Sequence, residues 1–172
     1  QTKHQAHALS FVKDRNCALD LGGHFGFWSR TLSTQFESVI AIEPNPLAVP
    51  FLRINVPSAK VLEFGRGDKT RIANLCVDIG KNSGAAYIDK TPSSRTREIE
   101  IKTLDSVPVD RLSFIKIDTE GYEFAILKGS VATIERWKPI INLEVKRSNV
   151  ARWNLGQFDA VNFLVERFGY KV

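Results

Sequence analysis

The sequence predicts an α/β fold with a doubly wound, Rossmann-like and mostly parallel sheet. Short apolar runs bounded by turn-forming residues alternate along the chain with segments whose apolar residues recur at helical spacing. The first of these runs ends in Asp20 and passes directly into a glycine-rich turn, and strands of such sheets carry their ligand sites at this end. A later stretch with period two interrupts the alternation and predicts an antiparallel insertion.

The composition is typical of a globular protein. With 172 residues, of which 43% are hydrophobic and 25% charged, the chain is long enough for one domain with a sizeable core, and we expect a single domain over residues 1–172. Its apolar runs are far shorter than a membrane span, and its first residues lack the apolar segment of a signal peptide. We therefore expect no membrane contact and a cytoplasmic location. Cys17 and Cys76 lie in apolar runs and are expected to be buried thiols.

Residues 1–71 predict a partly helical lead-in followed by three parallel strands. The order strand, helix, strand implies a parallel pair with a right-handed crossover. Pro44 and Pro46 end the second strand, and Pro50 suits the first turn of the helix that follows. Strands are expected at Cys17–Leu21, Val39–Glu43 and Lys60–Phe64, and helices at Phe25–Phe36 and Leu47–Asn55.

Residues 72–104 alternate apolar and polar side chains and predict an antiparallel meander between the third and fourth parallel strands, with turns at 81–84 and 91–94. The parallel pattern then resumes. Strands are expected at Leu112–Asp118 and Ile140–Val145, and helices at Gly121–Trp137 and Gln157–Phe168. Tyr170–Val172 is expected to begin a further strand, with the closing strands of the sheet truncated.

The glycine-rich turn favours a nucleoside without phosphates. The dinucleotide fingerprint, laid on Gly22, would require glycine where the chain has His24 and a small residue where it has Phe27. Glu43, however, ends the neighbouring strand about 20 residues further on, where a carboxylate can accept both hydroxyls of a ribose. An ordinary strand-to-helix turn without a ligand is the alternative.

The other residues of the turn have expected roles of their own. Asp20 is placed to receive a cationic amino group, directly or through water, and its alternative is a structural carboxylate. Gly22 and Gly23 allow positive φ and close approach of a ligand to the backbone, while Gly26 would let the next helix pack tightly on the strand.

An ordered set of motifs from about Cys17 to Val172 resembles the FkbM-type methyltransferases. The motifs are DLGGHFGFWS at Asp20–Ser29, AIEPNP at Ala41–Pro46, TLD at Thr103–Asp105, FIKIDTEGYE at Phe114–Glu123, and the later LKG, KPII and NLEV. The resemblance implies the class I S-adenosylmethionine-dependent fold and methyl transfer, commonly to a hydroxyl of a sugar, polyketide or other small molecule. The family commonly has Ala-Asn where this chain has Gly23-His24, so the backbone turn carries over and the side-chain hydrogen bonds from that position do not.

S-adenosylmethionine is then the expected cofactor. Gly67 and Asp68 follow the third strand and are the natural edge for adenine, with Asp68 accepting from the exocyclic amine. Phe25, Phe27 or Phe64 could pack on the adenine ring, with a core position as the alternative. The expected cofactor-binding residues are Asp20, Gly22, Gly23, His24, Phe25, Gly26, Glu43, Gly67, Asp68 and Asp118. The chain thus divides into a lead-in (1–16), an adenosyl-binding half (17–71), the antiparallel insertion (72–104) and an acceptor-side half (105–172).

Carboxylates at the ends of two later strands are the expected catalytic residues. A sulfonium donor is already activated, so the enzyme mainly aligns the acceptor oxygen with the methyl group, and a neutral hydroxyl also gains from a general base. We expect Asp118 to position cofactor or acceptor and Glu120 or Glu144 to act as the base, with His24 as a further candidate. A capping or salt-bridge role is the alternative for each carboxylate. Because no histidine accompanies them, we expect no metal site.

The expected partner is a small molecule with a hydroxyl group. Two alternatives stay open: a nucleic-acid methyltransferase and a methyltransferase-like domain that binds without catalysis. The net charge of +5 and one basic stretch favour nucleic acid only weakly, since a solvated surface has the same composition. The stretch contains Arg136, Lys138, Lys146, Arg147 and Arg152. The oligomeric state cannot be read from the sequence.

Overall fold

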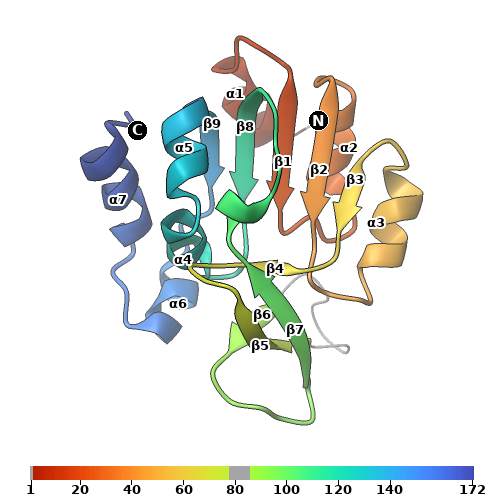
Figure 1. Cartoon of the computed structure of the whole chain (residues 1–172), viewed down its shortest axis with the longest axis vertical. Coiled ribbons are helices and arrows are strands. Elements are labelled where there is room, and N and C mark those ends of the chain that lie inside the picture. The colour runs from red at the N-terminus through yellow and green to blue at the C-terminus, as the bar shows by residue number, and fades with distance from the viewer. Residues whose placement is uncertain (1, 78–85) are drawn as a thin grey trace.

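The fold is built on a parallel sheet of five strands. A computed structural model describes residues 2–77 and 86–172, and its main sheet has the order β3-β2-β1-β8-β9 (Figure 1). The strands are β1 (Cys17–Leu21), β2 (Ser38–Ile42), β3 (Lys60–Leu62), β8 (Leu112–Ile117) and β9 (Ile140–Leu143). The strand order reverses between β1 and β8, which confirms the doubly wound prediction. A ligand site is expected at the carboxyl ends of these two strands.

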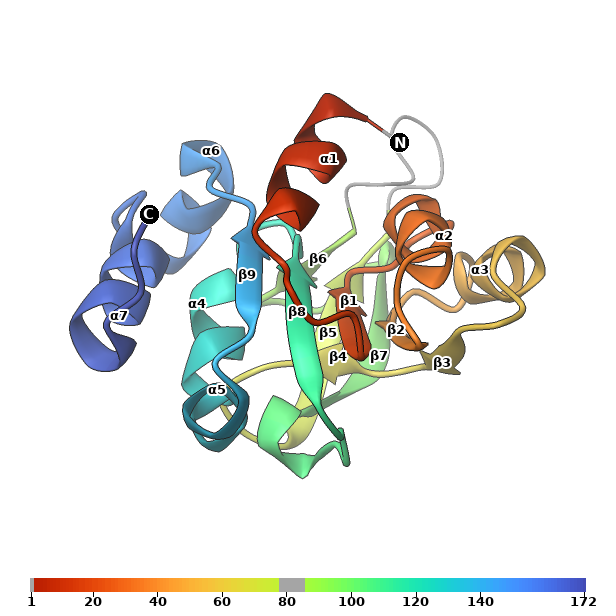
Figure 2. The same cartoon turned by 90° about the horizontal axis from the view of Figure 1, so that it is seen from above.

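Helices cover both faces of this sheet. Successive residues of a strand point to opposite faces, so a strand that is apolar throughout has an apolar surface on each side for helices to pack on. Ala18 and Phe114 pack with Leu9 and Leu32 on one face, whereas Leu19 and its neighbours pack with α4, α5 and α7 on the other (Figure 2). The helices are α1 (Lys3–Ser10), α2 (Phe27–Ser33), α3 (Val49–Asn55), α4 (Glu123–Lys128), α5 (Val131–Trp137), α6 (Arg147–Val150) and α7 (Asp159–Phe168), with 3-10 turns η1 (Leu104–Ser106) and η2 (Ala151–Trp153).

The insertion forms a second, smaller sheet beyond the carboxyl ends of the parallel strands (Figure 1). Its order is β4-β7-β5-β6, from β4 (Gly65–Arg66), β5 (Arg71–Cys76), β6 (Tyr87–Asp89) and β7 (Thr96–Lys102). The antiparallel pairs β5–β6 and β5–β7 confirm the predicted antiparallel insertion. Its predicted meander order is wrong, because β5 lies between β6 and β7, and β4 adds a parallel pair with β7 that the sequence did not predict. The turn predicted at 81–84 lies outside the described residues.

The helix predicted at Gly121–Trp137 is two helices, α4 and α5. Gly129 lies at the break, where an added Cβ would be 2.0 Å from the carbonyl oxygen of Gly67. The side chain of Asp105 accepts hydrogen bonds from the backbone N–H groups of Ala132 and Thr133, at 3.1 and 2.8 Å, and so caps the start of α5. The close contact and the cap together interrupt an apolar pattern that is otherwise continuous.

The prediction of a strand at Tyr170–Val172 is wrong. These residues are in no strand, and the Tyr170 hydroxyl instead donates to the carbonyl oxygen of Pro139 at 2.7 Å. This bond ties the end of α7 to the residue just before β9. Both cysteines are buried free thiols, as expected. None of the described helices is long and apolar enough to cross a membrane.

Candidate active site

The carboxylate of Glu43 holds the glycine-rich turn in place. Its Oε2 accepts from the backbone N–H of His24 at 2.7 Å, and its Oε1 accepts from that of Asn45 at 2.8 Å. The side chain is 5% exposed, and burial raises its pKa above the ordinary value although both hydrogen bonds act in the opposite direction. Each oxygen has lone pairs left to accept hydroxyl protons from a ligand.

The turn itself depends on Gly22. This residue has φ +82°, and an added Cβ would be 2.1 Å from the carbonyl oxygen of Asp118. Only glycine allows this approach, which brings the ends of β1 and β8 together. Gly26 has φ +90° and packs against Leu52 of α3 and against Val56, the residue after α3, rather than on the strand expected from the sequence.

Asp20 is fully buried and has protein partners for its charge. Its Oδ2 accepts from the Ser29 hydroxyl at 2.6 Å, and its Oδ1 lies 3.2 Å from the ammonium of Lys116, its cross-strand neighbour on β8. The Lys116 Nζ also donates to the Gly22 carbonyl at 2.8 Å and lies 3.7 Å from Asp118. This arrangement favours the structural alternative for Asp20.

The buried ammonium of Lys116 stays charged. Burial alone would lower its pKa, but the carboxylates of Asp20 and Asp118 outweigh burial and raise the pKa above its ordinary value. Lys116 therefore links the buried acid, the glycine turn and the acid at the edge of the site.

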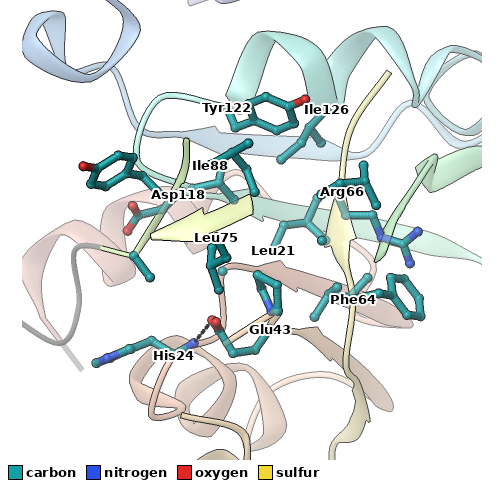
Figure 3. A pocket seen from close by; sticks show the side chains of 18 residues that line it. Leu21, His24, Glu43, Phe64, Arg66, Leu75, Ile88, Asp118, Tyr122 and Ile126 are labelled. Carbon is teal, nitrogen blue, oxygen red and sulfur yellow. Dashed lines mark hydrogen bonds between the residues drawn. The ribbon is translucent and has the colours of Figure 1, made fainter. Parts of the chain in front are cut away.

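A cavity lies between the two sheets, at the carboxyl ends of β1 and β2. Gly22, His24 and Glu43 line one side, and Leu75 and Ile88 of the small sheet line the other, with Asp118, Tyr122 and Tyr87 also in contact. Figure 3 shows Leu75 and Ile88 between Glu43 and Tyr122, with the His24–Glu43 hydrogen bond at the edge. The cavity is mostly apolar, and the carboxylates of Glu43 and Asp118 are its acidic groups. Ligand sites combine an apolar lining with a few polar groups in this way.

Phe64 lines the same cavity beside Arg66 (Figure 3). The guanidinium of Arg66 lies 4.1 Å from the Phe64 ring centroid and donates to the carbonyl oxygen of Thr103 at 2.8 Å. Burial lowers the pKa of Arg66 to about 9. The ammonium of Lys102 also lies 4.8 Å from this centroid, so two cations contact the Phe64 ring, which argues against an adenine stacking on it.

A second cavity adjoins the first. Gly22, His24 and Asp118 line both cavities, and the second adds Trp28, Lys116, Glu120 and Glu144. A molecule in one cavity would thus face a molecule in the other across this shared wall. Phe27 also lines the second cavity and is 76% exposed, so it does not lie where an adenine in the first cavity would stack.

The predicted catalytic carboxylates come together in the second cavity. One oxygen of each of Asp118, Glu120 and Glu144 lies within 4.8 Å of the others. Burial, and then the negative charges of Asp118, Glu120 and Glu123, raise the pKa of Glu144 from 4.5 to about 7. Oxygens this close together could hold a metal ion, although exposed acidic groups are also common without one, and the expectation of no metal site stays a prediction.

Other expected cofactor residues lie elsewhere. Asp68 pairs with Arg71 at 3.5 Å in a separate depression beyond Tyr122, and an added Cβ at Gly67 would contact Ile101 and Tyr122. Phe25 packs edge-on against Phe51, with ring centroids 5.4 Å apart. Like Gly23, these three residues are not among the described residues that line the first cavity.

The basic stretch expected near residues 136–152 does not form one surface. Arg136 and Lys138 lie before β9, and Lys138 donates to the carbonyl oxygen of Phe168. Lys146 and Arg152 follow β9, where they contact the Glu120 carboxylate and carbonyl oxygen respectively. The strand separates the two groups of charges, which weakens the nucleic-acid alternative.

The fold and the site together define a class of Rossmann-like domain. Its features are an acid after β2, a mostly apolar cavity beside that acid, and a second cavity with carboxylates on the other side of the wall that the two cavities share. The chain belongs to the family of the Methyltransferase FkbM domain, whose model matches residues 20–172. A comparison with curated proteins finds no match.

Two solved structures share the fold. The methyltransferase FkbM of Methylobacillus flagellatus aligns with a TM-score of 0.64 and 20% identity over 91% of this chain and 39% of that one. A precorrin-6y C5,15-methyltransferase of Geobacter metallireducens aligns with a TM-score of 0.52 and 20% identity over 97% of this chain and 71% of that one. The chain thus spans about two fifths of the length of the first.

Proposed function

We propose that this chain is an S-adenosylmethionine-dependent methyltransferase that transfers a methyl group to a hydroxyl of a small molecule. The observation that carries the proposal is the wall of Gly22, His24 and Asp118 that the two cavities share. The first cavity would hold the adenosyl group and the second the acceptor. The methyl group would then cross between them at Asp118. Membership of the FkbM family supports the same chemistry.

The residues divide the work of the proposed reaction. Glu43 would accept the ribose hydroxyls, the Gly22 turn would approach the methionine part, and Asp118 would orient the reacting groups. Glu144 would take the proton of the acceptor hydroxyl, because a base is most effective when its pKa is near the working pH. The cofactor would supply an activated methyl group, so that the acceptor oxygen would bond to the methyl carbon as the carbon–sulfur bond breaks, with S-adenosylhomocysteine as the product.

Titration calorimetry with S-adenosylhomocysteine tests the cofactor assignment directly. We expect saturable heat at one site, and no heat at high ligand concentration would refute the assignment. Transfer of a labelled methyl group to hydroxyl compounds then tests catalysis, and binding without transfer would favour the non-catalytic alternative. Binding of RNA that weakens steeply with salt would favour the nucleic-acid alternative.

Replacing Glu43 with alanine should weaken S-adenosylhomocysteine binding by about 1–3 kcal/mol, because charge-assisted hydrogen bonds to the ribose are lost. Calorimetry measures this change. Glu63→Ala is the matched control, since Glu63 is half-exposed at the end of β3 and pairs only with Arg53 among the described residues. Unchanged affinity in Glu43→Ala would refute the ribose role.

A further inference from the structure

Asn149 joins two of the carboxylates in the second cavity. Its side chain is 3% exposed, and its Nδ2 donates to Glu120 Oε2 at 2.7 Å and lies 3.5 Å from Glu144 Oε2. A primary amide has two N–H groups, so one can face each carboxylate. These two acids come from different elements, one after β8 and one after β9.

The orientation of this amide is fixed by its other neighbour. The Asn149 Oδ1 accepts from Arg152 Nη2 at 3.3 Å. Arginine can only donate and a carboxylate oxygen can only accept, so the amide oxygen must face Arg152 and the amide nitrogen must face the acids. A flipped amide would place its NH₂ group against the guanidinium of Arg152 and its oxygen against the carboxylate oxygens of Glu120 and Glu144.

The backbone of Asn149 is also held against the turn that carries Glu120. Gly121 has φ +103°, and an added Cβ there would be 2.5 Å from the Asn149 carbonyl oxygen. The Asn149 N–H donates to the Lys146 carbonyl at 3.0 Å at the start of α6. The side chain thus projects from a fixed point of the backbone toward both acids.

We infer that Asn149 is a positioning residue that holds Glu120 and Glu144 in place as carboxylates and so sets the pH at which the proposed base becomes available. A hydrogen-bond donor stabilises the charged form of a carboxyl group, whereas two facing carboxylates destabilise each other. Asn149 supplies neutral donors to both acids and adds no negative charge. The inference rests on the proposed function only in naming Glu144 as the base.

The other charges near Glu144 also affect its pKa. Asp118, Glu120 and Glu123 raise its pKa after burial, and Lys146 lowers it. Lys116 and His24 line the same cavity, and Arg152 donates to the Glu120 carbonyl. Because Glu144 interacts strongly with these neighbouring charges, the observable is the apparent midpoint of its titration.

The test is a carboxyl titration followed by ¹³C NMR on protein labelled at glutamate, with Glu144→Gln used to assign the resonance. In Asn149→Ala the midpoint should rise by about 0.5–1 pH unit, because donors to the charged form are lost. In Asn149→Asp, which keeps the shape, the added negative charge should raise it at least as far. The second variant keeps the test decisive if the first does not fold.

Asn162→Asp is the matched control. Asn162 is exposed on α7, so the same charge change there should leave the midpoint in place. An unchanged midpoint in folded Asn149→Ala or Asn149→Asp would overturn the inference, whatever the activity. Calorimetry with S-adenosylhomocysteine on the same samples tests the proposed function separately: heat with an unmoved midpoint refutes only the role of Asn149, and a moved midpoint without heat refutes only the cofactor.

Discussion

Replacing Glu144 with glutamine should lower kcat for methyl transfer by about 10²- to 10⁴-fold, the usual contribution of a general base. Glutamine keeps the size and hydrogen-bonding shape of the side chain but cannot take a proton. Binding of S-adenosylhomocysteine should change little, because Glu144 lines the acceptor cavity and not the cavity beside Glu43. Steady-state kinetics and calorimetry separate these two effects.

The pH dependence of the methyl-transfer rate is a second test of Glu144 as the base. The pKa of Glu144 is raised to about 7, so the wild-type rate should rise with pH through about 7 as the carboxyl group ionises. This acidic limb should be lost in Glu144→Gln, where the residual rate depends on other groups. A variant that keeps the wild-type limb would show that another residue is the base.

Stability should move in the opposite direction to activity. The folded-state pKa of Glu144 is about 7 and its ordinary value is 4.5, so the folded protein holds this proton more tightly than the unfolded chain. The cost to stability is absent below pH 4.5, grows as the pH rises, and is complete above about 7. Glu144→Gln removes it and should melt higher than the wild type at alkaline pH.

Glu166→Gln is the control for both measurements. Glu166 is exposed on α7, so this variant makes the same charge change away from the cluster. We expect wild-type kinetics and an unchanged pH dependence of melting. A Glu144→Gln variant that is both active and no more stable above pH 7 would contradict the role and the environment assigned to Glu144.

The three central strands of the parallel sheet, β1, β2 and β8, could be predicted because they are buried on both faces and read as nearly continuous apolar runs. All of Cys17–Leu21 is buried, and the strand predicted from this run has the same bounds as β1. The break in the helix before Trp137 could not be predicted, because it depends on contacts from distant segments: Gly67 against Gly129, and Asp105 capping α5. Local pattern carries no information about such contacts.

At the site, spacing identified the ends of strands but not the direction of side chains. Asp20 and Glu43 both lie at carboxyl ends of neighbouring strands, yet Asp20 points into the layer beneath α2 and Glu43 borders the cavity. Asp68 was expected at the adenine edge, but it pairs with Arg71 beyond Tyr122 because β4 leads the chain into the second sheet. The cavity-lining residues of β5 and β6 had no recognisable motif.

Two polar residues of the site were missed for different reasons. Lys116 stands in an otherwise apolar buried strand, and a charge in such a run indicates a buried partner, which is Asp20 here. That inference was within reach of the sequence. Asn149 follows a basic segment with no periodicity, and only the fold brings it to Glu120 and Glu144.

Replacing Lys116 with methionine should lower the free energy of unfolding by about 3–5 kcal/mol, because it leaves the buried charge of Asp20 without its ionic partner. The loss should be complete at neutral pH, since the folded-state pKa of Lys116 is above its ordinary 10.5 and the ammonium is fully charged there. Urea unfolding measures it. Lys102→Met, which removes the half-exposed pair with Glu100, should cost less than about 1 kcal/mol.

The double variant Asp20→Asn/Lys116→Met separates lost charge balance from lost packing. If the cost of Lys116→Met arises from an uncompensated carboxylate, the neutral asparagine should restore part of the stability, because it needs no ionic partner and can still bond to Ser29. The hydrogen bond from Lys116 to Gly22 is absent in both variants, so it cannot account for a difference between them. A double variant no more stable than Lys116→Met would mean that the ammonium acts mainly through the glycine turn and Asp118.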